Sequence, residues 1–215
     1  GSNVVQRRKE TSPSDPIDPL AMLFDARSVA MVGASPAPGS INGRPIRYLL
    51  QNGFSGKIYP VTPKYDFIGE LQCYPSVRDI PGPVDLAILA ISAARVPDII
   101  EDCAAKGIRT VIVFSSGYAE LGEDGRQAQE RLVEQAKRLG IRICGPNSMG
   151  TINLRTGLTA TFSTVVERSY RTGPIALVSQ SGMYAAYILA QAGALDVGVG
   201  LFATTGNEGD IPLSE

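Results

Sequence analysis

A loop between two apolar segments carries the residues best suited to bind an anion. The apolar residues 28–32 end at Gly33, a Pro- and Gly-rich loop continues to Gly43, and an apolar pattern resumes at 46–50. This order predicts a strand, a loop and a helix. Backbone N–H groups and the positive end of a helix dipole converge at such a junction and favour an anion, most often a phosphate. We therefore expect a phosphorylated ligand here.

The spacing within the loop narrows the kind of ligand. A dinucleotide fingerprint has the pattern G-x-G-x-x-G, followed about 20 residues later by an acid, whereas glycines stand here at 33, 39 and 43. No Gly-Lys-Ser/Thr of a Walker A loop follows. The next predicted strand is followed by Lys64 rather than by an acid. A lysine there favours an extra ribose phosphate, as in NADP and coenzyme A, with a solvated surface lysine as the alternative.

Three further predicted strands, 84–92, 110–115 and 141–145, also run into small residues. In open parallel sheets a ligand lies across the carboxyl ends of the strands, and small residues let the backbone approach it closely. Any one of these loops could simply be a tight turn. Because five such loops fall on one edge, we expect a ligand along that edge.

Strands alternate with helices over most of the chain, which predicts an α/β fold with a Rossmann-like, doubly wound parallel sheet. Gly107 and Gly140 stand where the second and third helices should end. Strands are expected at 29–34, 56–61, 84–92, 110–115 and 141–145, and helices at 45–51, 96–106 and 125–139.

The pattern becomes irregular at 146–172, where 159–163 is either a late strand or an inter-domain crossing, and restarts at Pro174. There a strand (175–178), a Ser-Gln-Ser-Gly junction, a helix (183–192) and a second strand (197–203) follow each other. Asp210 resembles the N-cap of a further helix. Two strands and one helix cannot bury a core of their own, so we expect a longer parent polypeptide. The expected divisions are a flexible lead-in with a tag scar (1–19), a ligand-binding domain (20–150), a connecting segment (151–173) and the start of a second domain (174–215).

The composition excludes several functions. The chain has no histidine, which removes Ser-His-Asp and Cys-His catalysis within it. A formal net charge of −1 argues against nucleic-acid binding, and no apolar run approaches the roughly 20 residues of a membrane span. The three cysteines have no metal-like spacing and are expected to be buried thiols in a reducing cytoplasm. We expect no metal site.

Eight short motifs follow one another over residues 20–215: Val32–Ser35, Gly53–Val61, Tyr74–Val77, Val84–Ala87, Ser116–Tyr118, Gly145–Asn147, Ser179–Gly182 and Gly206–Asn207. Each motif alone is weak, but in this order they span nearly the whole chain. Together they resemble the N-terminal part of NDP-forming acyl-CoA synthetases, relatives of the succinyl-CoA synthetase alpha subunit and of ADP-forming acetyl-CoA synthetase.

The resemblance implies that the first domain binds coenzyme A (CoA) and that a flavodoxin-like α/β domain begins after it. Lys64 would meet a CoA phosphate, and Ser148 stands where the family often has a cysteine. The other implied CoA contacts are Gly33, Ala34, Ser35, Gly39 and Ser40 at the phosphates, Ile91 and Ser92 along the adenine or pantetheine path, and Ser116, Gly117 and Asn147 near the thiol.

The family reaction converts acyl-CoA and phosphate to an acyl phosphate, then passes the phosphoryl group through a histidine to ADP. A helix N-terminus with Ser and Gln donors can hold a phosphoryl group. The resemblance implies that the phosphohistidine is held by Ser179, Gln180, Ser181 and Gly182. The alternative is that these residues only cap the helix. ADP/ATP, Mg²⁺, the histidine and an ATP-grasp domain or subunit would belong to the rest of a parent that forms homo- or hetero-oligomers. No catalytic residue is expected within the chain itself.

Two other functions stay open at this point. One is a CoA-sensing regulatory domain, since synthetase-like segments are also fused to protein acetyltransferases. The other is an NADP-binding oxidoreductase domain, which the missing dinucleotide fingerprint disfavours.

Overall fold

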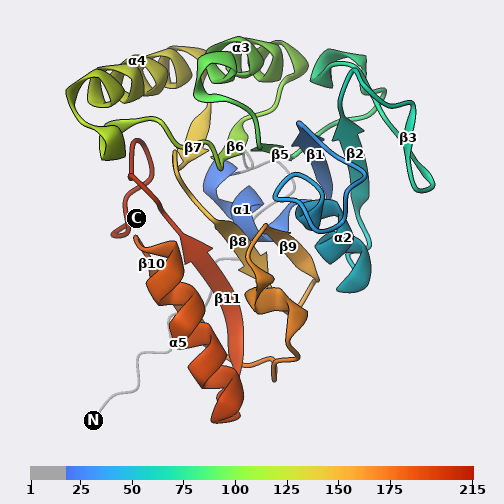
Figure 1. Cartoon of the computed structure of the whole chain (residues 1–215), viewed down its shortest axis with the longest axis vertical. Coiled ribbons are helices and arrows are strands. Elements are labelled where there is room, and N and C mark those ends of the chain that lie inside the picture. Colours follow the sequence, from blue (N-terminus) through green and yellow to red (C-terminus); the bar gives the residue numbers. More distant parts are fainter. Residues whose placement is uncertain (1–17) are drawn as a thin grey trace.

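The computed structural model describes residues 18–215, so most of the predicted lead-in, 1–19, lies outside it. A five-stranded parallel sheet forms the first half of the molecule (Figure 1). The predicted α/β, doubly wound sheet is confirmed. Its strands are β1 (Ser28–Val32), β2 (Lys57–Val61), β5 (Leu86–Leu89), β6 (Thr110–Val113) and β7 (Arg142–Cys144).

The strand order, β2-β1-β5-β6-β7, places a crossover between β1 and β5. The chain leaves β1 toward β2 on one side and then crosses back to β5 on the other. The loops after β1 and β5 therefore diverge, which opens a crevice at the carboxyl ends of these two strands. A two-stranded hairpin, β3 (Phe67–Ile68) and β4 (Leu71–Gln72), lies between β2 and β5 in the sequence.

Helices cover both faces of this sheet, so β1 and β5 are fully buried and apolar. The helices α3 (Val96–Lys106) and α4 (Glu123–Leu139) pack on one face (Figure 1). The other face is covered by α1 (Met22–Asp25) and α2 (Arg44–Gln51). The predicted helix ends are confirmed, because Gly107 and Gly140 both adopt the left-handed conformation after α3 and α4.

A second sheet has the order β10-β11-β8-β9. Its strands β10 (Ile175–Ser179) and β11 (Val199–Thr204) are parallel, and α5 (Gly182–Ala194) packs beside them. The predicted connecting segment 151–173 contributes most of the antiparallel hairpin of β8 (Gly150–Asn153) and β9 (Leu158–Thr161), which pairs with β11. The expected domain boundaries remain a prediction.

The hairpin also holds the two sheets together. Thr151 Oγ1 and Asn153 Nδ2 on β8 donate to the carbonyl oxygens of Leu23 and Phe24 in α1, at 2.6 and 2.9 Å. On β9, Leu158 and Ala160 are buried in the core of the first sheet. Short, polar strands of this kind lack an apolar run, which is why the sequence pattern looked irregular.

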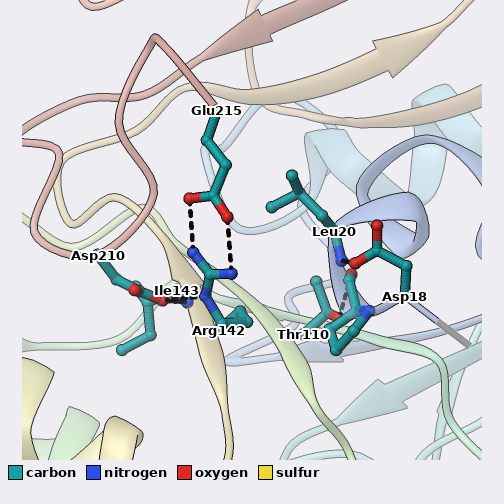
Figure 2. Close-up of polar contacts among 8 residues, drawn as sticks. Asp18, Leu20, Thr110, Arg142, Ile143, Asp210 and Glu215 are labelled. Carbon is teal, nitrogen blue, oxygen red and sulfur yellow. Dashed lines mark hydrogen bonds and ion pairs between the residues drawn. The ribbon is translucent and has the colours of Figure 1, made fainter. Parts of the chain in front are cut away.

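Asp210 was expected to cap a helix, and the structure corrects this. Its carboxylate instead accepts hydrogen bonds from the Ile143 amide at 2.8 Å and Arg142 Nε at 3.0 Å. The remaining nitrogens of Arg142 donate to both carboxylate oxygens of Glu215, at 3.0 and 2.8 Å (Figure 2). Asp210 therefore binds Arg142 on β7, whose guanidinium presents donors on two sides.

Within residues 18–215, no helix is long and apolar enough to cross a membrane.

Candidate functional site

A cavity of about 400 Å³ lies at the carboxyl ends of β1, β2 and β5, where the strand order reverses. It is the crevice that the topology predicts for a ligand. Six of the predicted contact residues line it: Gly33, Ala34, Ser35, Ser40, Lys64 and Ile91. Several other lining residues were not among the predicted contacts, including Asn42, Tyr65, Ser76, Val77, Arg95, Ile99 and Asp102.

The loop after β1 is held in a shape that requires glycine. At Gly33, φ is +85° and an added Cβ would lie 2.4 Å from the Ala90 carbonyl oxygen. At Gly43 it would lie 1.9 Å from the Ala37 carbonyl oxygen. Asn42 Nδ2 donates to the carbonyl oxygens of both Gly33 and Ala90, each at 2.7 Å. The Asn42 side chain thereby ties the end of β1 to the end of β5.

The first amides of this loop are already hydrogen-bonded. Gly33 and Ala34 donate to the Val61 carbonyl at 3.0 and 3.4 Å, and Ser35 donates to the Asn42 carbonyl at 3.4 Å. Among residues 18–215, no acceptor is recorded for the amides of Gly39, Ile41 and Asn42. An anion bound at this loop would therefore accept hydrogen bonds from the amides of residues 39, 41 and 42, whereas residues 33–35 form part of the cavity wall. The predicted phosphate contacts at Gly33–Ser35 remain a prediction.

Two cations face the cavity without a partner among the described residues. Lys64 follows β2, and Arg95 stands at the N-terminus of α3; both are exposed. The one carboxylate in the lining, Asp102, accepts from Arg78 Nε at 2.6 Å. Arg95 could have been found from the sequence, since it ends the small-residue loop after β5 and directly precedes a helix.

A second, uncharged groove of about 410 Å³ adjoins the cavity. Asn42, Ala90 and Ile91 line both, so the two form one path from the end of β2 to the end of β6. Of the predicted residues, Ile91, Ser92 and Ser116 line the groove. Gly39 lines neither space.

The predicted contacts Gly117 and Asn147 lie beyond this path, where the two sheets meet. Asn147 Nδ2 donates to Asn207 Oδ1 at 3.3 Å, and Asn207 Nδ2 donates in turn to Glu120. The amides of Gly117 and Tyr118 also donate to Glu120. Burial raises the pKa of Glu120, but these hydrogen bonds outweigh it and hold the pKa below its usual range. Asn207 is part of the motif Gly206–Asn207, but no contact is predicted for it from the sequence.

Ser148 and the cysteines are buried structural groups. Ser148 Oγ donates to the Thr204 carbonyl of β11 at 2.7 Å. Cys73, Cys103 and Cys144 are buried and free, as predicted. Burial raises the pKa of the Cys103 thiol to about 12, and burial raises that of Cys144 to about 11 despite its contact with Ser148. Among residues 18–215, no group of side chains is suited to hold a metal ion.

The second predicted junction follows β10 and is built differently. Ser181 caps α5 by accepting from the Tyr184 amide at 3.3 Å, and Ser179 Oγ donates to the Ser181 carbonyl at 3.1 Å. Gln180 and Ser181 are exposed. None of Ser179, Gln180, Ser181 and Gly182 lines the cavity or the groove. Capping is thus observed, and phosphoryl binding remains a prediction.

Comparisons with known proteins identify the family of the region that forms the first sheet. Residues 27–153 match the protein family described as CoA binding domain. The chain is 44% identical over 168 residues to acetate–CoA ligase [ADP-forming] II of Archaeoglobus fulgidus, covering 78% of this chain and 25% of that protein. It is 38% identical over 196 residues to acetate–CoA ligase [ADP-forming] I subunit alpha of Pyrococcus furiosus, covering 89% and 42%.

A solved structure resembles almost the whole chain. The dinucleotide-forming acetyl-coenzyme A synthetase 1 of Ca. Korarchaeum cryptofilum, in complex with phosphate and ADP, superposes with a TM-score of 0.84 at 34% identity. The match covers 90% of this chain and 40% of that one. The chain therefore spans between a quarter and about two fifths of the length of these relatives.

Proposed function

Because the chain belongs to the CoA binding domain family, we propose that it holds CoA along the carboxyl edge of the first sheet. One observation carries the proposal: a cavity with two cations that have no partner within residues 18–215 shares part of its lining with an uncharged groove. CoA has a charged nucleotide end and a long, neutral pantetheine arm, so its two halves match the two spaces.

In this arrangement Lys64 meets the 3′-phosphate, and the loop from Gly33 to Ser40 borders the remaining phosphates. Ile91 and Ser92 accompany the pantetheine arm along the groove. Ser116 lines the end of the groove nearer the CoA thiol, and Gly117 and Asn147 lie beyond it, where the two sheets meet.

We propose that the parent protein is an ADP-forming acyl-CoA synthetase, an acid–thiol ligase. It would convert acyl-CoA, phosphate and ADP to an acid, CoA and ATP through an acyl phosphate and a phosphohistidine. The chain contains no histidine, so the relay histidine, the ADP and Mg²⁺ site and the ATP-grasp unit would be supplied outside it. Ser179–Gly182 would then hold the phosphoryl group at the N-terminus of α5.

The names of the relatives support the ligase over the two alternatives, because each is a CoA ligase or synthetase. One of them is the alpha subunit of its enzyme, which supports a partner subunit or fused domain for this chain as well. The three buried, free thiols support a reducing compartment such as the cytoplasm.

Calorimetric titration of the protein with CoA, 3′-dephospho-CoA and NADPH tests the binding proposal. We expect CoA to bind most tightly, dephospho-CoA more weakly and NADPH not at all. Binding of NADPH without binding of CoA would contradict the proposal and favour the oxidoreductase.

A further inference from the structure

The far wall of the cavity combines apolar side chains with two polar groups. It comes from three elements, the segment after β2, the 3-10 helix η2 (Val77–Asp79) and α3, and none of its residues lines the groove. A bridge between Val61 and Tyr74 sets the residues before η2 beside the end of β2. Tyr65, Val77 and Ile99 supply the apolar surface, and Ser76 and Asp102 supply the polar groups.

Helix α3 presents a stripe of three residues to the cavity. Arg95, Ile99 and Asp102 are spaced four and three residues apart, so they share one face of the helix. The cation stands at the start of the stripe and the carboxylate about two turns further along. A phosphate would be attracted to the first position and repelled from the second. The Asp102 end of the cavity is therefore unsuited to a phosphate and suited to a hydrogen-bond donor.

Asp102 and Ser76 retain hydrogen-bonding capacity toward the cavity. Asp102 Oδ1 accepts from Arg78 Nε at 2.6 Å, and no donor to Oδ2 is recorded among residues 18–215. Ser76 Oγ accepts from the Arg78 amide at 3.2 Å, which leaves its hydroxyl proton free to be donated. Because both side chains bond to Arg78, the wall offers one acceptor and one donor near each other, together with an apolar surface.

This pattern is complementary to adenine. The Hoogsteen edge of adenine presents a donor, the 6-amino group, beside an acceptor, N7, whereas a 6-oxopurine presents two acceptors there. If the pantetheine arm leaves through the groove, the linear order of CoA places its base in the part of the cavity away from the groove, where this wall lies outside the shared lining. We infer that the far wall is the base subsite and that Asp102 selects adenine by accepting a hydrogen bond from its 6-amino group, an inference that rests on the proposed CoA site.

The test compares CoA with its deaminated analogue, which carries hypoxanthine in place of adenine. Titration calorimetry on the unaltered protein should give an analogue dissociation constant about tenfold higher or more, the effect of losing a hydrogen bond to a charged group. In Asp102→Asn the ratio of the two constants should fall to within about threefold, because an amide can donate to the 6-oxo group.

Two further variants separate the carboxylate from its surroundings. Arg78→Gln removes the ion pair but keeps the Asp102 acceptor, so the preference for CoA should persist. Asp98→Asn, on the same helix but outside the cavity lining, should also keep it. Equal affinities of the unaltered protein for CoA and the analogue would overturn the inference while leaving the CoA site intact. Absence of CoA binding would instead overturn the proposed function, and the inference with it.

Discussion

The two strand–loop–helix junctions of this chain differ in what surrounds them. The junction after β1 lies inside its sheet, with β2 on one side and β5 on the other, and the loops of all three strands enclose a cavity. The junction after β10 lies on a sheet edge, because β10 pairs only with β11 among the described strands. Its helix α5 continues with exposed apolar residues, including Met183 at 84% exposure.

The difference shows what a junction needs in order to become a binding site. Both junctions bring a helix N-terminus to the end of a strand, and both contain the small residues that the motif requires. Only the first has neighbours that supply walls and charge, namely Lys64 after β2 and Arg95 directly before α3. A helix N-terminus contributes a modest attraction for an anion, so neighbouring strands decide whether a ligand is enclosed.

The largest expected difference concerns one glycine from each junction. Gly33→Ala places a Cβ 2.4 Å from a backbone oxygen at a positive φ, whereas Gly182→Ala meets only the side chain of Met149, which can rotate. We expect Gly33→Ala to lower the free energy of unfolding by about 2–4 kcal/mol and Gly182→Ala to change it by less than about 1 kcal/mol. Urea denaturation measures both, and equal losses would contradict this contrast.

The Asn42 side chain closes the first junction and has no counterpart in the second. Asn42→Ala removes two hydrogen bonds of 2.7 Å and leaves the Gly33 and Ala90 carbonyls without this donor. We expect a loss of about 2 kcal/mol of unfolding free energy together with weaker CoA binding. Asn52→Ala is the matched control, because Asn52 makes one local bond to Tyr48 at the end of α2; its CoA affinity should be unchanged.

The charge at Lys64 should matter for the ligand rather than for the fold. Lys64→Glu should weaken CoA binding by about 1–2 kcal/mol, roughly tenfold, because a cation facing a phosphate becomes an anion. If Lys64 faces the 3′-phosphate, the same substitution should weaken the binding of 3′-dephospho-CoA less than that of CoA. Lys57→Glu, at the opposite end of β2, controls for the change in net charge. Equal losses for both ligands would place Lys64 away from that phosphate.

At the second junction, Ser181→Ala removes the cap of α5. The expected effect is a loss of about 0.5–1 kcal/mol of stability with no change in CoA affinity, because Ser181 lies outside the cavity and the groove. A clear change in the CoA dissociation constant would mean that the two junctions share one ligand site.

The smallest expected effect concerns the contact between the two regions. The folded protein lowers the pKa of Glu120 through hydrogen bonds that include Asn207, although burial opposes the shift. Its contribution to stability is therefore complete above the ordinary glutamate pKa of about 4.3 and is lost as the pH falls through the lowered value. Denaturation midpoints measured from pH 6 down to pH 3 should fall less steeply in Glu120→Gln than in the unaltered protein.

Much of the first sheet could be predicted from the sequence. Its three inner strands, β1, β5 and β6, are buried along their whole length, and Gly107 and Gly140 mark helix ends through their own backbone conformations. The loop at 33–43 was recognisable for the same reason, since the positive φ of Gly33 and the close approach of Gly43 to Ala37 both require glycine. These features depend on neighbours in the chain, which a linear pattern records.

The tertiary structure alone decided the remaining features. The pairing of β8 with β11 and the recruitment of Asp210 by Arg142 join residues about fifty or more positions apart. The same holds for the cavity wall, where Ser76 and Asp102 line one cavity because η2 packs beside α3. Local sequence determines which elements form, because propensity and periodicity act over a few residues. Which side chains face one cavity depends on strand order and packing, and these are properties of the folded chain.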